Sequence, residues 1–368
     1  MTTAATPGPR PSPRRSLFDE APFLLFWETT RACDLACLHC RACAVPQRSA
    51  RELDTREGKA LLAEARSMGV PLVVLTGGDP AKREDLVELV RYGTEIGLRM
   101  ALTPSATALV TPELLTSLKE AGLARLALSL DGAVPETHDA FRGFSGSHAR
   151  TLEILRTARA LGLTTQVNTS VSPRNVDEMP AIAALMEELD LELWSVFVVV
   201  PTGRAEGGAT LDAERTERLL EWLASLSERV RFDIKTTAAP QLRRVLLQRK
   251  HPRSDIVGLR DGIGRATRGV NDGSGVAFVS HEGDVFPSGF LPIRCGNVRE
   301  EGLRAIYREH PLFQSLRAPS ELTGKCGRCE FRFVCGGSRA RAYATQLSPL
   351  ASDPACPYEP GPLADARA

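Results

Sequence analysis

Short apolar runs alternate with longer segments of mixed polarity along most of the chain. The apolar runs predict six strands, near 23–27, 72–75, 99–102, 125–130, 165–168 and 194–200. A helix is predicted after each of them, near 51–67, 83–96, 112–121, 147–161, 176–189 and 211–230. Six strand–helix units in series favour a parallel sheet with right-handed crossovers, and continuously apolar strands are typical of a sheet covered on both faces. We therefore predict an α/β fold built on a partial, TIM-like (βα)6 barrel.

The pattern changes after the sixth unit. A short strand, Phe232–Lys235, and another helix precede a basic stretch near 250–269, which lacks apolar periodicity and is predicted to be a mobile loop. A β-hairpin is expected next, with strands near Val276–Ser280 and Asp284–Phe286 joined at Glu282-Gly283. The first 17 residues are rich in Pro, Arg and Ser, which predicts disorder. The expected organisation is a disordered tail at 1–17, a barrel core at 18–240, a linker with the mobile loop at 241–275, a small C-terminal domain at 276–358 and a second tail at 359–368.

Composition narrows the class of protein. The 368-residue chain has 43% apolar residues, enough for a sizeable core, and a formal net charge of +1, which gives no electrostatic reason to expect nucleic acid or an anionic membrane as a partner. No run of eighteen apolar residues is present, so no membrane-spanning helix is predicted. The start of the chain lacks the apolar core of a signal peptide, so a cytoplasmic protein is expected. The 9 cysteines gather toward the two ends, which indicates metal binding in a reducing compartment rather than a disulfide framework.

The most informative segment, residues 33–40, directly follows the first predicted strand and is named here the cluster loop. Its three thiols belong to Cys33, Cys37 and Cys40. Three thiolates can hold three irons of a 4Fe-4S cluster and leave the fourth iron open for chemistry. Cys43 extends the run, so a closed four-thiolate site, or a zinc site completed by His39 or Cys43, is an alternative. His39 and Arg41 are otherwise expected to surround the cluster and tune it without binding it.

The C-x3-C-x2-C spacing after a strand resembles the cluster loop of the radical SAM superfamily, in which the open iron binds the amino and carboxylate groups of S-adenosylmethionine. The run from Gly77 to Pro80 resembles the family's Gly-Gly-Glu-Pro motif, with Asp in place of Glu. The resemblance implies that S-adenosylmethionine contacts residues at the strand ends, namely Gly77, Gly78, Asp79, Ser129, Arg142 and Asn168. It assigns the Ser129 hydroxyl to the ribose and the Arg142 guanidinium to the carboxylate. For each residue, a strand-end turn or a surface salt bridge is the alternative.

Four cysteines near the end of the chain resemble the ligands of the second auxiliary cluster in the SPASM extension of that family. They are Cys326, Cys329, Cys335 and Cys356. The resemblance implies one auxiliary 4Fe-4S cluster in a small C-terminal Fe-S domain. A further auxiliary cluster is not expected, because Ser288 and Arg339 stand where the extension has cysteines, and Cys295 is left over. A structural zinc ribbon is the alternative.

The resemblance also implies the activity. A radical SAM enzyme cleaves S-adenosylmethionine reductively, with electrons from a donor such as flavodoxin or ferredoxin, and the 5′-deoxyadenosyl radical takes hydrogen from a substrate carbon. Cys40-Arg41-Ala42 and the run from His138 to Gly143 resemble the branch that alters tetrapyrrole side chains in alternative haem synthesis. This predicts oxidative modification or decarboxylation of a tetrapyrrole propionate. One alternative is a SPASM-type maturase of a ribosomal peptide, so the expected substrate is a small molecule or a peptide. The other alternative is a non-catalytic Fe-S or zinc-binding protein.

Overall fold

The computed structural model describes residues 18–205, 210–249 and 269–361, and its strands form one ten-stranded sheet. The strands are β1 (Leu24–Glu28), β2 (Leu72–Thr76), β3 (Arg99–Leu102), β4 (Arg125–Ser129), β5 (Thr165–Val171), β6 (Leu193–Val198), β7 (Asp233–Thr237), β8 (Val276–Val279), β9 (Asp284–Phe286) and β10 (Gly296–Asn297). Their order is β10-β9-β8-β1-β2-β3-β4-β5-β6-β7. The neighbours from β8 to β7 pair in parallel, and β9 and β10 continue the sheet in antiparallel fashion.

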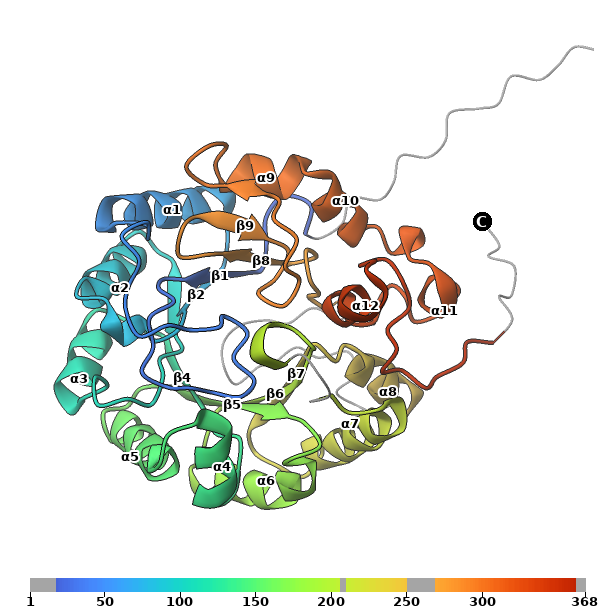
Figure 1. The fold of residues 1–368 in the computed structure, drawn as a ribbon, viewed down its shortest axis with the longest axis horizontal. Helices are drawn as coiled ribbons and strands as arrows, with labels where there is room; N and C mark the ends of the chain where they lie inside the picture. The colour runs from blue at the N-terminus through green and yellow to red at the C-terminus, as the bar shows by residue number, and fades with distance from the viewer. Residues whose placement is uncertain (1–17, 206–209, 250–268, 362–368) are drawn as a thin grey trace, which may run out of the picture.

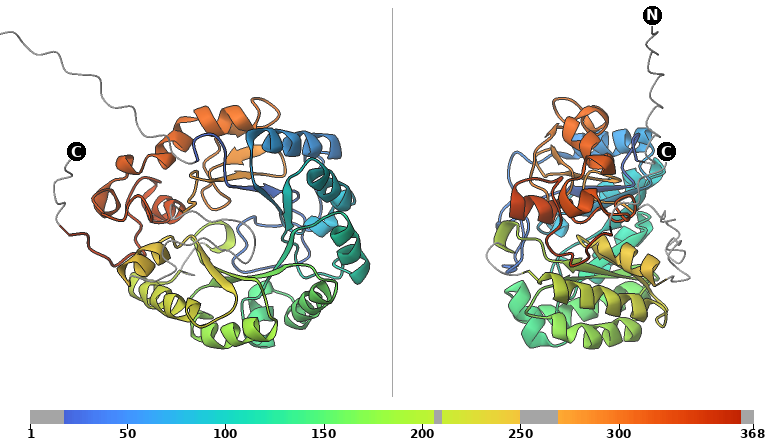
Figure 2. Two further views of the ribbon diagram at one scale, coloured as in Figure 1. Left: turned by 180° about the vertical axis from the view of Figure 1, so that it is seen from behind. Right: turned by 90° about the vertical axis from the view of Figure 1, so that its right-hand side faces the viewer.

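Most of the helices cover the outside of this curved sheet, and those after β8 belong to the C-terminal segment. The helices are α1 (Thr55–Met68), α2 (Leu86–Glu95), α3 (Pro112–Glu120), α4 (Pro135–Arg142), α5 (Ser147–Ala160), α6 (Met179–Glu188), α7 (Ala213–Ser227), α8 (Gln241–Gln248), α9 (Leu303–Glu309), α10 (Pro311–Arg317), α11 (Gly324–Gly327) and α12 (Arg339–Gln346). Short 3-10 turns lie at Pro80–Lys82 (η1), Val176–Glu178 (η2), Gly203–Ala205 (η3) and Pro319–Glu321 (η4). Figure 1 looks into the ring of strands with helices α1 to α7 around it, and Figure 2 shows the same arrangement from behind and from the side. The sheet order leaves β7 and β8 unpaired with each other, so the barrel is partial.

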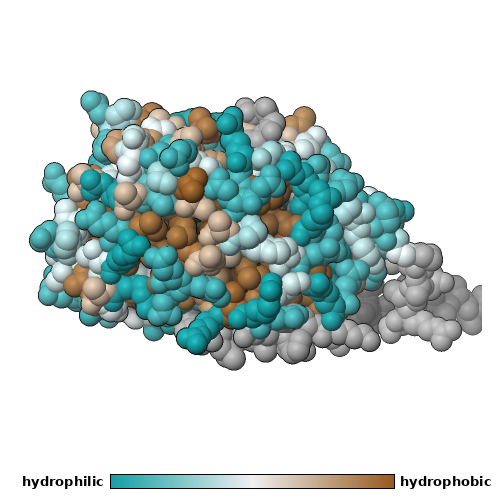
Figure 3. Space-filling model, turned by 90° about the horizontal axis from the view of Figure 1, so that it is seen from below, coloured by the Kyte–Doolittle hydropathy of each residue, from teal (hydrophilic) through white to brown (hydrophobic). Residues whose placement is uncertain are grey.

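Successive side chains of a strand point to opposite faces of the sheet and so enter two different apolar clusters. On β1, Leu25 and Trp27 are fully buried in the main core between the sheet and the outer helices. Leu24 and Phe26 belong instead to a small apolar cluster on the inner face of the sheet, with Leu72 of β2. This is why the strands read as continuously apolar in the sequence. The outer face over α4 to α6, which Figure 3 views from below, is mostly hydrophilic, with apolar residues visible between the polar ones.

The C-terminal segment is built onto the first strand of the barrel. β8 pairs with β1 in parallel, with Leu24 opposite Val276. The first turn of helix α9 is bound by a side chain of α1. The Glu64 carboxylate accepts hydrogen bonds from the backbone N–H of Leu303 at 3.0 Å and of Arg304 at 2.9 Å. A carboxylate at this position satisfies the N–H groups of the first helical turn. In Figure 1 the orange and red elements after β8 accordingly lie beside α1 at one side and close to α8 at the other.

The predicted strand–helix units are confirmed, and the parallel sheet extends further than predicted. The six predicted strands correspond to β1 to β6, and the predicted short strand near 232–235 is β7. The sequence predicted β8 and β9 as a hairpin but not the parallel pairing of β8 with β1, which joins segments about 250 residues apart. The predicted mobile loop near 250–269 and the first tail lie almost wholly outside the described residues, as does most of the second tail. Among the described residues no helix is long and apolar enough to cross a membrane.

Candidate functional site

The cluster loop lies at the carboxyl end of β1, across the middle of the ring in Figure 1. A hydrogen bond joins the start of the cluster loop to the segment that follows it, because Cys33 N–H donates to the carbonyl of Val45 at 2.8 Å. From the opposite side of the barrel, the Arg204 guanidinium in η3 donates to the carbonyl of Cys37 at 3.2 Å and to that of Ala44 at 2.7 Å. The loop is therefore held by both sides of the barrel.

Gly203, the residue before Arg204, lets the two segments approach. Its φ is +60°, in the left-handed region, and a Cβ there would lie 2.5 Å from the carbonyl oxygen of Arg41 and 2.6 Å from that of Cys40. A similar close approach occurs on the other side, where a Cβ on Gly143, just after α4, would lie 2.8 Å from the carbonyl oxygen of Ala36. Glycines thus set the distance between the cluster loop and both neighbours.

The three thiols of the cluster loop line a single cavity of about 1090 Å³ inside the barrel. Each sulfur lies within reach of a hydrogen-bond donor: Leu35 N–H at 3.4 Å from Cys33, Arg142 Nη1 at 3.8 Å from Cys37, and Ala44 N–H at 3.4 Å from Cys40. The Ser105 hydroxyl is a further neighbour, 3.3 Å from Cys33 Sγ, which sequence reasoning did not identify. Donors directed at sulfur stabilise thiolates, so this set of residues fits an Fe-S cluster.

Arg142 is held in place at the end of α4 by Asp131. Arg142 Nη2 lies 2.5 Å from Asp131 Oδ2, and the carboxylate is fully buried. Burial, the largest single influence, would raise the pKa of Asp131, but the charge of Arg142 acting together with His39, His138 and the hydrogen bond from Ser170 N–H holds that pKa below its usual value. His39 lies 3.9 Å from the same carboxylate, and burial lowers the pKa of His39 to about 4. Near neutral pH this leaves the guanidinium charge beside Cys37 neutralised by one carboxylate.

The residues that the resemblance assigned to S-adenosylmethionine divide into two groups. Those that line the cavity are Gly77, Gly78, Ser129, Arg142 and Asn168. Asp79 does not line it: its buried carboxylate accepts hydrogen bonds from Thr107 Oγ1 at 2.7 Å and from Ser105 N–H at 3.2 Å. The structure therefore places Asp79 as a support of the neighbouring loop. Its contact with S-adenosylmethionine stays a prediction.

The two glycines also serve the fold itself. A Cβ on Gly77 would lie 2.4 Å from the carbonyl oxygen of Thr30, and one on Gly78 would lie 2.5 Å from that of Ala32. The N–H of Gly78 donates to the Thr30 carbonyl at 2.7 Å. The end of β2 thus packs directly on the backbone that leads into the cluster loop, a reason for glycine independent of any ligand.

A buried polar network beside the cluster loop was not predicted from the sequence. Arg41 Nη2 donates to Glu28 Oε2 at 2.7 Å, and the other Glu28 oxygen is 2.9 Å from His281 Nδ1. The Arg41 guanidinium also lies over the Phe278 ring, 4.5 Å from its centroid. Burial, the largest single influence, would raise the pKa of Glu28, but the charges and hydrogen bonds of Arg41 and His281 together lower that pKa. Because Arg41 lines the cavity, this network places a cation next to the cluster loop.

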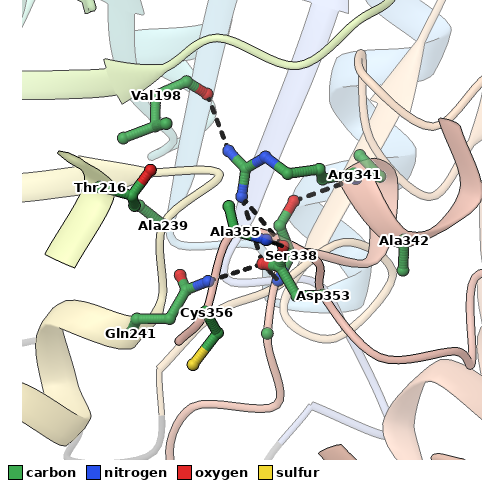
Figure 4. Close-up of polar contacts among 12 residues, drawn as sticks. Val198, Thr216, Ala239, Gln241, Ser338, Arg341, Ala342, Asp353, Ala355 and Cys356 are labelled. Atoms are coloured by element: carbon green, nitrogen blue, oxygen red, sulfur yellow. Dashed lines mark hydrogen bonds and ion pairs between the residues drawn. The ribbon is translucent and has the colours of Figure 1, made fainter. Parts of the chain in front are cut away.

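The C-terminal cysteines are anchored to the barrel through Asp353 (Figure 4). This fully buried carboxylate accepts hydrogen bonds from Gln241 Nε2 of α8 at 2.7 Å and from Ser338 N–H at 2.7 Å. It also forms an ion pair with Arg341, whose Nη2 reaches the carbonyl of Val198 at the end of β6 at 3.2 Å. The segment that carries Cys356 is therefore tied to two elements of the barrel.

The four C-terminal thiols are close enough to influence one another. Burial raises the pKa of Cys335 to about 12, and the neighbouring Cys356 and Cys326 add to the increase. Backbone N–H groups point at two of the sulfurs, from Asp353 to Cys326 and from Gly337 to Cys335, both at 3.4 Å. Buried thiols with N–H donors fit an Fe-S cluster, which supplies the positive charge that their thiolates need. In the described parts of the chain, no three His, Cys, Asp or Glu side chains are grouped so that they could hold a single metal ion.

Ser288 and Arg339, which stand where the SPASM extension has cysteines, both make contacts of their own in the structure. Ser288 is buried, and its hydroxyl accepts a hydrogen bond from Phe290 N–H at 3.2 Å. Arg339 is buried as well, and its Nη2 lies 3.7 Å from Cys326 Sγ. Cys295 is buried, which raises its pKa to about 12, whereas Cys43 is exposed. The two cysteines outside the predicted ligand sets thus differ from each other in exposure.

Comparison with known proteins gives a consistent picture. Residues 27–186 match the family model described as the Radical SAM superfamily. The chain is 41% identical to an AdoMet-dependent heme synthase of Methanosarcina barkeri, over 93% of this chain and 98% of that protein. It is 32% identical to an Fe-coproporphyrin III synthase of the same organism, over 92% and 88%. In fold it resembles Streptococcus suis SuiB, solved with bound S-adenosylmethionine, with a TM-score of 0.69 at 18% identity over 92% of this chain and 78% of that one.

Proposed function

The chain belongs to the radical SAM superfamily, and from this premise we propose that it makes haem by oxidative decarboxylation of propionate side chains of an iron coproporphyrin. Membership makes it an enzyme of radical chemistry with a 4Fe-4S cluster and S-adenosylmethionine as cofactors. The observation that carries the substrate assignment is the 41% identity to an AdoMet-dependent heme synthase over nearly the whole of both chains. The resemblance of Cys40-Arg41-Ala42 to the tetrapyrrole branch supports the same conclusion.

The cavity supports a large substrate with several carboxylates. Its volume of about 1090 Å³ is slightly above the roughly 300–1,000 Å³ that is usual for small-ligand sites, which leaves room for a cofactor and a substrate together. The inner apolar cluster on β1 to β3 offers one wall to a macrocycle. Cationic side chains lie around the rest of the lining, at Arg41, Arg99, Arg125, Lys235 and Arg243. Guanidinium and ammonium groups in a partly apolar cavity suit propionate carboxylates.

The cluster loop is proposed to hold the catalytic cluster through Cys33, Cys37 and Cys40. When bound, the cluster and S-adenosylmethionine supply the 5′-deoxyadenosyl radical that removes a hydrogen atom from the substrate. Gly77, Gly78, Ser129, Arg142 and Asn168 are proposed to position S-adenosylmethionine from the strand ends, with Asp79 as a further candidate. Arg41, which lines the cavity beside the cluster loop, is proposed to orient a carboxylate of the substrate there.

The substrate chemistry requires an electron acceptor. The propionate loses a hydrogen atom from the carbon attached to the ring, the bond to the carboxylate carbon breaks, and CO2 leaves as the vinyl double bond forms. One electron remains and must go to an oxidant. We assign that role to an auxiliary 4Fe-4S cluster held by Cys326, Cys329, Cys335 and Cys356.

The decisive experiment uses anaerobically reconstituted protein with dithionite or a reduced flavodoxin or ferredoxin as electron donor. Iron coproporphyrin III and S-adenosylmethionine are added, and the porphyrin is analysed by mass spectrometry for loss of CO2 and two hydrogens from each converted side chain. The expected product is haem, with 5′-deoxyadenosine formed in proportion. A porphyrin that stays unchanged while S-adenosylmethionine is cleaved would overturn the substrate assignment. It would redirect attention to a peptide substrate.

A further inference from the structure

Each of the two cysteine sites has an arginine, largely shielded from solvent, next to a thiol sulfur. At the cluster loop, Arg142 Nη1 lies 3.8 Å from Cys37 Sγ. At the C-terminal site, Arg339 Nη2 lies 3.7 Å from Cys326 Sγ. A positive charge at this distance stabilises the more negative, reduced state of a cluster, because reduction adds one electron to the Fe-S core. What differs between the two sites is whether a carboxylate cancels that charge.

The arginine at the cluster loop is neutralised. Asp131 pairs with Arg142 at 2.5 Å, and both side chains are shielded from solvent, with exposures of 0% and 12%. A neutral ion pair has only a weak, short-range effect on the potential at the cluster. This pair thus adds little to favour the reduced state, which suits a cluster that must give its electron to S-adenosylmethionine. Arg204 also reaches the cluster loop, but it donates to the carbonyls of Cys37 and Ala44 and not to a sulfur.

The arginine at the C-terminal site is not neutralised. Arg339 is only 2% exposed, and its other N–H groups donate to carbonyl oxygens, from Nε to Gly337 at 3.1 Å and from Nη1 to Pro349 at 3.0 Å and Ala351 at 2.7 Å. In the part of the chain that the structure describes, it forms no ion pair with a carboxylate. Burying a charge without a counter-charge is costly, so the neighbouring anion that balances Arg339 is the thiolate cluster itself.

Other arginines near the C-terminal site do not supply this surplus charge. Arg341 is paired with Asp353, and Arg244, whose charge is felt by Cys356, is paired with Glu217. Each of these pairs is close to neutral. Arg332 and Lys325 also lie near the site, but they donate to the carbonyls of Cys329 and Cys356 and not to a sulfur. Arg339 is thus the buried arginine that faces a C-terminal sulfur without a carboxylate partner among the described residues. It stands where the seven-cysteine extension has a cysteine of the further auxiliary cluster, so it removes no ligand from the C-terminal site.

We propose that Arg339 raises the reduction potential of the C-terminal cluster above that of the N-terminal cluster and so makes it the acceptor of the substrate's electron. Arg339 acts here as a positioning and electrostatic residue, since it touches a cluster ligand and not the substrate. The inference rests on the proposed function for the source of the electron. The electron balance is that of the decarboxylation: the substrate radical loses one electron as CO2 leaves, and the C-terminal cluster is reduced by one.

The test measures the two potentials directly. In reconstituted protein whose cluster-loop cysteines are all changed to alanine, an anaerobic redox titration monitored by EPR reports the C-terminal cluster alone. A companion variant, Cys326→Ala with Cys329→Ala, reports the N-terminal cluster. The C-terminal potential is expected to be the higher of the two. An equal or lower C-terminal potential would overturn the proposal, whatever the enzyme does with porphyrin.

Substitution of Arg339 then tests the cause. Arg339→Gln in the alanine-loop background should lower the ratio of reduced to oxidised C-terminal cluster about tenfold at a fixed solution potential, which is about 59 mV for one electron. Arg339→Lys, which keeps the charge, should lose much less. Arg294→Gln is the matched control, because that arginine is half exposed on the hairpin and pairs with Asp284. It should leave the potential unchanged.

The outcomes separate this proposal from the proposed function. If Arg339→Gln keeps its iron and the wild-type potential, Arg339 is only structural and the proposal fails. If both Arg339 variants lose iron to the same extent, charge is not what the site requires, and the proposal again fails. If the potentials behave as expected but no porphyrin is decarboxylated, the substrate assignment is wrong while the role of Arg339 stands.

Discussion

Replacing Asp353 by Asn should weaken the junction between the C-terminal domain and the barrel. Asp353 is fully buried and lies 3.2 Å from Arg341, which is itself 3% exposed. The substitution keeps the shape of the side chain but leaves the guanidinium buried without a counter-charge. Breaking a buried pair in this way costs about 3–5 kcal/mol. With a urea slope of about 3 kcal/mol per molar, the unfolding midpoint should fall by about 1 M or more.

The measurement is an anaerobic urea titration of reconstituted protein followed by tryptophan fluorescence. Asp284→Asn is the control, because it removes the carboxylate of a surface pair whose arginine is half exposed, a change worth about 0–1 kcal/mol. The double variant Asp353→Asn with Arg341→Met removes both buried charges and should regain most of the lost stability. A double variant as unstable as Asp353→Asn alone would refute the argument that an uncompensated charge is the cause.

Three further predictions address the cysteine sites. Gly203→Ala should reduce iron incorporation at the cluster loop, because its Cβ would lie 2.5 Å and 2.6 Å from the carbonyl oxygens of Arg41 and Cys40. Gly146→Ala, also at positive φ but with no atom within 4 Å of its Cβ, should leave the iron content measured in the same analysis unchanged. Native protein should approach about eight irons per chain, and the variant with all three cluster-loop cysteines changed to alanine should keep about four, because the C-terminal four-thiolate site is complete without them. Almost no iron in that variant would favour a zinc ion at the C-terminal site over an Fe-S cluster. Under native conditions iodoacetamide should label the exposed Cys43 well before Cys295, because burial raises the pKa of Cys295 to about 12. Mass spectrometry gives the order of labelling, and the reverse order would contradict the assigned burial.

The sequence was most informative where function requires a local motif. Apolar runs predicted the strands because inner and outer faces of a parallel strand are both buried, and the cluster loop carries its thiols within eight residues. Sequence patterns could not predict the Glu28–His281 contact, whose partners are 253 residues apart. Arg339 was recognised as a missing cysteine, but its approach to a sulfur depends on how the segment around Cys326 folds.

Asp79 illustrates a different limit. Its place after two glycines identified the motif, yet the fold directs its carboxylate to Thr107 and Ser105 instead of into the cavity. A motif indicates which backbone segment approaches a ligand, because spacing and glycine content are readable from the sequence. The direction of each side chain depends on neighbours from other elements, in this case the loop after β3, which the motif does not contain.

The parallel pairing of β1 with β8 has a consequence for synthesis of the chain. β1 leaves the ribosome well before the strand that covers its free edge, which begins at Val276. At about 5–20 residues per second, roughly 13–50 s pass between the two. Throughout that interval the strand that leads into the cysteines has an open hydrogen-bonding edge, which invites pairing with other chains. Insertion of the metal group is therefore expected to follow the emergence of β8, and chains cut short before β8 should aggregate and remain colourless.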